Sequence, residues 1–475
     1  MNCGAAAQVA ANPLVLRLIF SHLSPTDLKT VSLVSSLWRE TSDDPQLWSW
    51  AVMRLTGRNL MDVLSSTRLR AVRAALYDGT REDTDTVTES LKNISELLVN
   101  NNLILKYLKF VTFLESSSHN STRLANILSR VEQVDLQELK LHADFAFYDD
   151  VMRSIAGNSN IKLKSLNITE ADLLGVDEEI LSLALNKIEK VEMSKVKILP
   201  EQFQAIFNDF LVGDSQLKSL NLSRISPLSI SPDQTFSKTV CNLVEIVLRG
   251  TDRVIDIQTL LLKILETENL TLKRLDVSEN CLSHVSPSTL VGVVRRLDSV
   301  GLAKTDMTGS HLSSLFNTIS AEGQLKELDV GGNNLSISVP PNTLATAITR
   351  LRIVNLWRTN LSEGQVNSLF KEIVQTDNLE LRNLNISQNN LSSLTPVEFS
   401  RGVRRLEEVT MLRCKLVNTS SSSYGSYSLP PHDSYLQPVS EVAGKLRVLK
   451  GNFLLSGQII ERLNVKLHKF CHSFF

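Results

Sequence analysis

The chain has 475 residues, of which 42% are hydrophobic and 21% are charged, so it can bury ample core and is not disordered as a whole. Its net charge of −1 gives no electrostatic reason to expect nucleic acid or an anionic membrane surface as a partner. The 5 cysteines are scattered without a C-x-x-C pair, and no apolar run approaches the length that crosses a bilayer.

The N-terminal segment does not have the character of a secretion signal. It lacks a basic start, and Arg17 interrupts its apolar part. Residues 1–11 are small and Ala-rich and are expected to form a flexible tail. We therefore expect an intracellular protein, located in the cytoplasm, the nucleus or both.

Residues 12–57 are predicted to form three short helices, over roughly 13–23, 25–41 and 45–55. The segment resembles an F-box, whose pattern runs from a Pro through I-F-x-x-L, a Leu after an acidic residue, V-S-x-x-W and a late L-W. The matching positions are Pro13, Ile19, Phe20, Leu23, Asp27, Leu28, Val34, Ser35, Trp38, Leu47 and Trp48. The sequence departs from the pattern at Asn12 and Val15. A three-helix knob that caps the following repeats is the alternative interpretation.

Residues 58–104 are predicted to form a helical linker. The stretch 80–90 is polar, and 90–100 has the apolar spacing of an amphipathic helix. LKYLKFVTF (105–113) is interpreted as a degenerate first repeat, the atypical unit expected at the end of a repeat array. The repeat domain is therefore predicted to cover 105–475, with about 11–12 units.

The stretch LKRLDVSENCL (272–282) fits the leucine-rich-repeat pattern L-x-x-L-x-L-x-x-N-x-L. Leu275 and Val277 are two residues apart, so both point inward from a strand. The Asn280 amide can pair with backbone groups that the turn after the strand leaves unpaired. Further copies start at Leu136, Leu163, Ile188, Leu217, Leu243, Leu297, Leu325, Leu351, Leu381 and Leu406.

From Leu163 to Leu406 the steps between starts alternate between short ones of 25 or 26 residues and long ones of 28 to 30. One class of unit carries an Asn in the turn and the other a Thr or Cys: Asn280, Asn333, Asn389; Thr251, Thr305, Thr359, Cys414. This alternation resembles the ribonuclease-inhibitor-like class of leucine-rich repeats. Segments with helical apolar spacing follow the strands, so we predict an α/β fold in which a curved solenoid has strands on its concave side and helices on its convex side.

Residues 417–441 interrupt the rhythm and are rich in Ser, Gly, Pro and Tyr, so they are predicted to form an extended loop. The loop is either a tolerated insertion or a cover over the concave face. No nucleotide-binding or hydrolase motif occurs, and we expect no catalytic residue and no cofactor. His468 and His472 are one helical turn apart, but a single pair is a weak metal site, so no metal is expected.

The outward positions of the strands provide a binding surface. The candidate substrate-binding residues are Val247, Arg249, Arg274, Asp276, Ile353, Trp357, Arg358, Leu412 and Arg413. An outward Trp357 has no core to fill, so it is a candidate contact unless the loop or a neighbouring side chain covers it. One position further along in the alternate units stand Lys195, Lys304, Arg358 and Arg413. This basic line either favours an acidic or phosphorylated peptide or is a solvated edge.

An F-box followed by leucine-rich repeats resembles the substrate receptors of SCF-type cullin–RING ubiquitin ligases. The resemblance implies that the F-box docks on the SCF adaptor protein, and through it on a cullin, while the repeats select an unknown protein substrate. The adaptor contacts that it implies are Pro13, Leu16, Ile19, Phe20, Leu23, Leu28, Val34 and the partly structural Trp48. Two alternatives stay open: a scaffold without ubiquitin transfer, and a Ran-type GTPase-activating protein, which also uses ribonuclease-inhibitor-like repeats.

Overall fold

The structure, a computed structural model, describes residues 13, 16, 20, 30–31, 33–42, 52–55, 74–78, 84–100, 105–111, 118–135, 145–158, 161–212, 215–225, 234–251, 255–322, 324–415 and 448–450. The chain divides into two compact units, Met1–Ile230 and Ser231–Phe475. Each unit contains a parallel sheet whose strands alternate with helices.

The first unit begins with a helix, and its strands pair in chain order from β1 to β7. Its elements are α4 (Ser36–Ser42), β1 (Val52–Leu55), β2 (Ala74–Asp78), α7 (Thr84–Asn100), β3 (Tyr107–Val111), α8 (Ser118–Leu128), β4 (Gln133–Asp135), α9 (Phe145–Gly157), β5 (Ser165–Asn167), α10 (Glu178–Asn186), β6 (Lys190–Glu192), α11 (Pro200–Val212) and β7 (Ser219–Asn221).

The second unit repeats this alternation, and its strands pair in chain order from β8 to β15. Its elements are α12 (Gln234–Asn242), β8 (Glu245–Val247), α13 (Ile257–Glu266), β9 (Arg274–Asp276), α14 (Pro287–Val294), β10 (Ser299–Gly301), α15 (Gly309–Ala321), β11 (Glu327–Asp329), α16 (Pro341–Thr349), β12 (Ile353–Asn355), α17 (Glu363–Gln375), β13 (Asn383–Asn385), α18 (Pro396–Val403), β14 (Glu408–Thr410) and β15 (Val448–Lys450).

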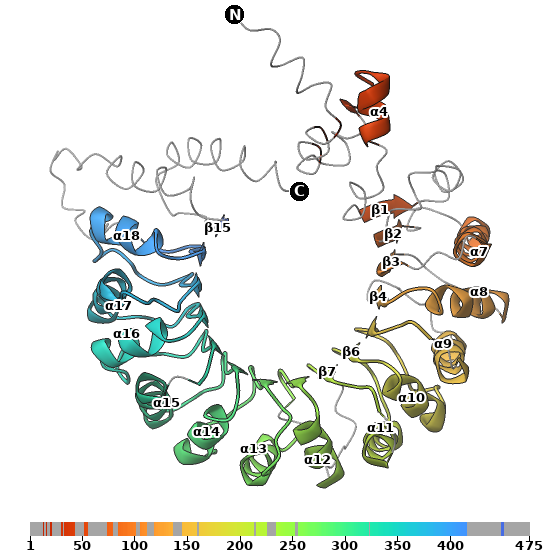
Figure 1. Cartoon of the computed structure of the whole chain (residues 1–475). Helices are drawn as coiled ribbons and strands as arrows, with labels where there is room; N and C mark the ends of the chain where they lie inside the picture. Colours follow the sequence, from red (N-terminus) through yellow and green to blue (C-terminus); the bar gives the residue numbers. More distant parts are fainter. Residues whose placement is uncertain are drawn as a thin grey trace, which may run out of the picture. The chain divides into compact units, whose positions relative to one another are not determined.

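Within each unit the strands line the concave side and the helices the convex side (Figure 1). Each predicted start from Leu163 to Leu406 lies two residues before a strand. In the repeat that starts at Leu272, the residues that the pattern places inward are all buried: Leu272, Leu275, Val277, Asn280 and Leu282. The predicted leucine-rich-repeat solenoid is confirmed.

The turn asparagines hold neighbouring repeats together through buried hydrogen bonds. The Asn280 Nδ2 donates to the carbonyl oxygen of Leu248 in the preceding repeat at 2.7 Å and to that of Val277 in its own at 2.8 Å. Its Oδ1 accepts the N–H of Thr251 at 2.6 Å. These contacts satisfy backbone groups that the turns leave unpaired, as predicted.

The same contacts explain why two classes of repeat alternate. Asn333 accepts the N–H of Thr305 at 3.2 Å and donates to the Leu302 carbonyl oxygen at 2.7 Å. The Thr305 hydroxyl donates to that same oxygen at 2.8 Å, so the Leu302 carbonyl oxygen accepts a hydrogen bond from each of the two residues. An Asn therefore reaches back to a small partner in the preceding repeat, which makes a pair of repeats the structural period.

The N-terminal segment differs from the prediction at two helices. The helix predicted over 25–41 is interrupted, because Leu33 and Val34 form a turn and the Ser35 Oγ accepts the N–H of Trp38 at 3.1 Å to begin α4. The helix predicted over 45–55 is wrong at its end, where β1 pairs with β2. A neighbouring strand gives these residues a hydrogen-bonded ladder, which overrides a local helical pattern.

Strands also begin before residue 105. The segment 58–104, predicted as a helical linker, contains β2 as well as α7, which confirms the helix expected over 90–100. The repeat start expected at Leu136 is wrong, because β4 ends at 135 and places the start at the buried Val131. Valines stand there where the pattern expects leucines. The tail 1–11, the loop 417–441 and the pair of histidines at 468 and 472 lie outside the described residues.

Candidate partner-binding surfaces

The described part of the F-box-like segment has a small aromatic core. Phe20 and Leu16 are buried, and the rings of Phe20 and Trp38 meet edge to face with centroids 5.4 Å apart. The Thr41 hydroxyl, on α4, donates to the Leu37 carbonyl oxygen at 2.8 Å. This ring contact packs α4 against Phe20.

Two exposed apolar residues among the described residues of this segment are at the turn before α4. Val34, a predicted adaptor contact, is 61% exposed, and its neighbour Leu33 is 77% exposed. Pro13 is exposed as well. Leu16 and Phe20, by contrast, belong to the core of the segment, and the other predicted contacts lie outside the described residues: Ile19, Leu23, Leu28 and Trp48.

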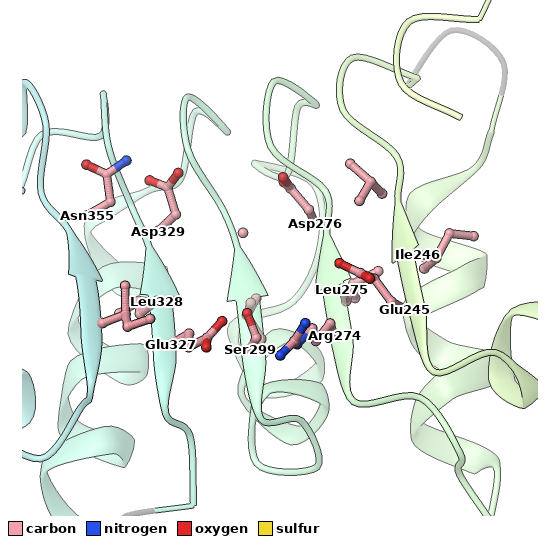
Figure 2. A pocket seen from close by; sticks show the side chains of 14 residues that line it. Glu245, Ile246, Arg274, Leu275, Asp276, Ser299, Glu327, Leu328, Asp329 and Asn355 are labelled. Atoms are coloured by element: carbon pink, nitrogen blue, oxygen red, sulfur yellow. The ribbon is translucent and has the colours of Figure 1, made fainter. Parts of the chain in front are cut away.

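The second candidate is the concave sheet surface of the second unit, here called the strand face, which consists of the outward side chains of β8 to β14 and of the residue two positions after each strand. A hollow of about 340 Å³ lies on it across β8 to β12. Four of the predicted substrate contacts line the hollow: Val247, Arg274, Asp276 and Ile353. Figure 2 shows that Asp276 and Asp329 come from the strands on either side of β10.

Glycines make room on this surface. A Cβ at Gly301, on β10, would lie 2.4 Å from Asp276 Oδ1. A Cβ at Gly331 would lie 3.2 Å from Asp329 Oδ1 and 3.4 Å from Trp357 Cε3. The carboxylate and the indole therefore occupy space that any side chain at these positions would take.

The strands end in a common side-chain hydrogen bond. Asp276 Oδ1 accepts the N–H of Ser278 at 2.9 Å, and Asp329 Oδ1 accepts that of Gly331 at 2.9 Å. Asparagines do the same one and two strands beyond Asp329, at Asn355 and Asn385. Asn167 and Asn221 stand at this position in the first unit, and each makes the same bond.

Burial raises the pKa of Asp329 above its ordinary 3.8, and the nearby Asp276 carboxylate raises it further. The hydrogen bonds from Gly331 N–H and the Asn355 side chain, and the charge of Arg249, lower the pKa in part. Burial therefore makes the charged form of this carboxyl group less favourable in the folded chain.

Arg249 and Lys304, on the β8–β11 part of the strand face, are each paired with an acidic side chain. The Arg249 guanidinium lies 3.6 Å from Asp276 Oδ2 and 3.5 Å from Glu279 Oε1. The same Glu279 oxygen lies 3.7 Å from Lys304 Nζ. Lys304 also lies over the Trp357 ring, 5.3 Å from its centroid, so a neighbouring side chain partly covers the outward tryptophan.

The β12–β14 part differs. Ile353 is 37% exposed and Leu412 is 41% exposed. Arg358 and Arg413 are exposed too, and within the described part of the chain neither guanidinium has an ion pair or a side-chain hydrogen bond. The predicted basic line is therefore uneven: Lys304 is paired, and Lys195 in the first unit lies 2.7 Å from Glu170, whereas the two arginines are not.

One backbone feature recurs along both units. The third residue after each strand from β5 to β14 has a positive φ, between 52° and 76°. We call these ten residues the left-handed row: Glu170, Lys195, Arg224, Gly250, Glu279, Lys304, Gly332, Arg358, Gln388 and Arg413. The region costs an L-residue about 1 kcal/mol relative to glycine, and the next strand's carbonyls hold it through hydrogen bonds such as Arg358 N–H to Ser387 O at 2.9 Å.

Sequence reasoning missed Glu279, the acid that pairs two cations, and its uncharged counterpart Gln388, because both lie on the αL turn and not on a strand. The alternation that it found could have identified them, since each stands one residue before a turn Asn. Among the described residues no cluster of three or more metal-ligating side chains occurs, and no helix there is long and apolar enough to span a bilayer. Cys414 is buried and reduced in the turn predicted for it, and burial raises its pKa to about 11.

Comparison with known proteins supports the two-part composition. A family model described as F-box-like matches residues 14–54, and one described as Leucine Rich Repeat matches residues 380–401. No curated protein matches the sequence. Two solved structures resemble the fold at 15% identity. The leucine-rich repeat-containing protein LegL7 from Legionella pneumophila has a TM-score of 0.39 and covers 72% of this chain and 99% of its own. A chain in the crystal structure of the Rad7 and Elc1 complex in yeast has a TM-score of 0.46 and covers 87% and 99%. The chain thus joins an F-box-like segment to leucine-rich repeats.

Proposed function

We propose that the protein is the substrate-recognition subunit of an SCF-type cullin–RING ubiquitin ligase, working in the cytoplasm, the nucleus or both. The F-box-like segment binds the SCF adaptor, and through it a cullin, while the repeats bind the protein to be ubiquitinated. The observation that carries this proposal is the family match at residues 14–54 on a chain whose later described residues form leucine-rich repeats.

In this role the protein performs no bond chemistry. It holds a target near a ubiquitin-loaded enzyme and thereby raises the local concentration of the target. The exposed turn before α4 supports the adaptor contact, because Leu33 and Val34 are apolar, adjacent and accessible. Helical adaptors are commonly bound through such apolar side chains.

The test is capture of the SCF adaptor and a cullin by the full chain from cell lysate. Leu33→Glu with Val34→Glu should abolish capture, and because both side chains are exposed the core formed by Phe20 and Trp38 is left intact. Ile337→Glu is the matched control, since Ile337 is 89% exposed in the second unit and should not affect capture.

Each outcome decides between the alternatives. Adaptor capture that the double variant loses, together with a target that accumulates when the protein is removed, supports the ligase role. Capture without any accumulating target leaves a scaffold. If the unaltered chain captures no adaptor, the ligase role is rejected and a repeat-based binding protein remains.

A further inference from the structure

The strand face carries two versions of one charge arrangement. Glu279 stands in the left-handed row one residue before the buried Asn280, and its carboxylate contacts Arg249 and Lys304. Gln388 stands in the same row one residue before the buried Asn389, but it carries an uncharged amide. An acid that neutralises two cations in one repeat is thus replaced by its neutral isostere in another.

Gln388 lies between two cations in the row. The Arg358 N–H donates to the Ser387 carbonyl oxygen at 2.9 Å, and the Gln388 N–H donates to the Leu412 carbonyl oxygen at 2.8 Å, so the three row residues are on consecutive strands. Neighbouring parallel strands lie about 4.8 Å apart, which places the backbones of Arg358 and Arg413 about 10 Å apart.

No acidic side chain in the described part of the chain is paired with either arginine. Among the described residues, the strand-end acceptor is an Asp on β9 and β11 but an Asn on β12 and β13, which keeps the hydrogen bond and removes the charge. The Glu408 carboxylate stands at the opposite end of β14 from Arg413 and accepts from the Asn383 amide at 3.2 Å. Two guanidiniums therefore face solvent, and the exposed apolar side chain of Leu412 adjoins Arg413 in the chain, whereas Ile353 stands at the opposite end of β12 from Arg358.

We propose that Arg358, Gln388 and Arg413 form a docking edge for an acidic protein segment. The segment carries two Asp or Glu side chains two or three residues apart, with an apolar side chain next to them. This names the chemistry of the target and so rests on the proposed function.

Charge and geometry support this occupant. Each guanidinium can bind one carboxylate through two parallel hydrogen bonds. Carboxylates at i and i+2 of an extended strand are about 7 Å apart on one face, and those at i and i+3 of a polyproline II segment are about 9 Å apart. Both spacings suit two long side chains whose backbones are about 10 Å apart. The Gln388 amide between them can bind the segment's backbone.

The experiment is selection of a displayed library of random, unmodified peptides on the full chain. The selected peptides are expected to contain the acidic pair beside an apolar residue, and their binding should weaken as salt is raised. Gln388→Glu reproduces the arrangement of Glu279 and should weaken binding of the selected peptides about tenfold or more at an unchanged thermal midpoint.

Two further variants separate binding from folding. Arg358→Gly with Arg413→Gly should abolish binding while the thermal midpoint is unchanged or higher, because glycine accepts the positive φ at these positions. Lys195→Gln is the matched control: it removes a cation from the same row in the first unit, where the cation is already paired with Glu170, and should leave peptide binding unchanged.

The proposal is overturned if no peptides or only non-acidic peptides are selected. It is also overturned if Gln388→Glu binds the selected peptides as tightly as the unaltered chain does, or if Lys195→Gln weakens their binding as much as the double arginine variant does. It is also overturned if a phosphoserine peptide binds where its unmodified acidic counterpart does not. Adaptor capture without acidic-peptide binding removes only this inference. Acidic-peptide binding without adaptor capture removes the ligase role and leaves the docking edge.

Discussion

The β8–β11 and β12–β14 parts of the strand face share one backbone frame and differ in the charges mounted on it. In the first part Asp276, Glu279 and Asp329 surround Arg249 and Lys304. In the second, the equivalent positions hold amides, and two arginines have no ion pair with any described residue.

This difference shows that the repeat backbone restricts the shape and hydrogen bonding of the side chains at these positions more than it restricts their charge. Asp and Asn serve equally as the strand-end acceptor, and Glu and Gln serve equally in the left-handed row. A chain can therefore change the electrostatic character of one part of its surface without disturbing the fold.

The largest expected effect tests whether the two parts of the strand face share one backbone frame. Asn280→Ala and Asn389→Ala each remove buried hydrogen bonds to carbonyl oxygens of two repeats, at 2.7–2.8 Å for Asn280 and 2.7–3.1 Å for Asn389. Each should lower the free energy of unfolding by about 3 kcal/mol, because buried backbone groups lose their partners. Urea unfolding measures both. A loss in one variant and none in the other would show that the two parts do not share a frame.

The next effect concerns the hollow, which lies across the first part and reaches β12. Gly301→Ala puts a Cβ 2.4 Å from Asp276 Oδ1, so the carboxylate must move away from Arg249, and we expect a loss of about 1–3 kcal/mol. Gly331→Ala is the matched control, since its nearest contact is 3.2 Å and its neighbours need shift only slightly. Equal losses in thermal unfolding of the two variants would contradict this account.

Exchange of the charged and neutral row residues should alter stability less than either change above. Glu279→Gln leaves Arg249 and Lys304 without their common acceptor and should lower the free energy of unfolding by less than about 1 kcal/mol, because these side chains are partly exposed. Gln388→Glu should raise it by a similar or smaller amount. Both differences should shrink at high salt. Urea unfolding at two salt concentrations would reject the comparison if both variants shifted in the same direction.

The repeat frame could be predicted from sequence because its residues alternate in a regular pattern. Leu272, Leu275 and Asn280 have positions fixed by burial and by the turn, and each is where the pattern places it. The repeat pattern gave a wrong start at Leu136, because β4 uses valines at its inward positions. The pattern also missed β1 and β2, whose pairing depends on a neighbouring strand more than on local composition.

The candidate site could be predicted only in part, because sequence gives the outward direction of a side chain and not its partners. Trp357 was predicted from its exposed register, but the covering by Lys304 follows from the packing of three strands. The pairing of Arg249 with Glu279 joins residues of different repeats. The contrast between Glu279 and Gln388 is visible in the sequence, yet its meaning depends on which cations the turn brings beside each.

The smallest expected effect concerns the pH dependence of the first part. Burial raises the pKa of Asp329 in the folded chain above its ordinary 3.8, so between these two values the folded state binds more protons than the unfolded state, and stability falls as pH rises through this window. Asp329→Asn keeps an acceptor for Gly331 N–H, as Asn355 does on the next strand. The variant should therefore be slightly more stable than the unaltered chain at pH 7, and the difference should vanish as pH falls towards 3.8. Asp276→Asn is the control, because it removes the carboxylate that faces Arg249 and should bring no gain. Thermal unfolding across this pH range measures both, and a gain for Asp329→Asn that does not change with pH would show that burial of the charge is not its cause.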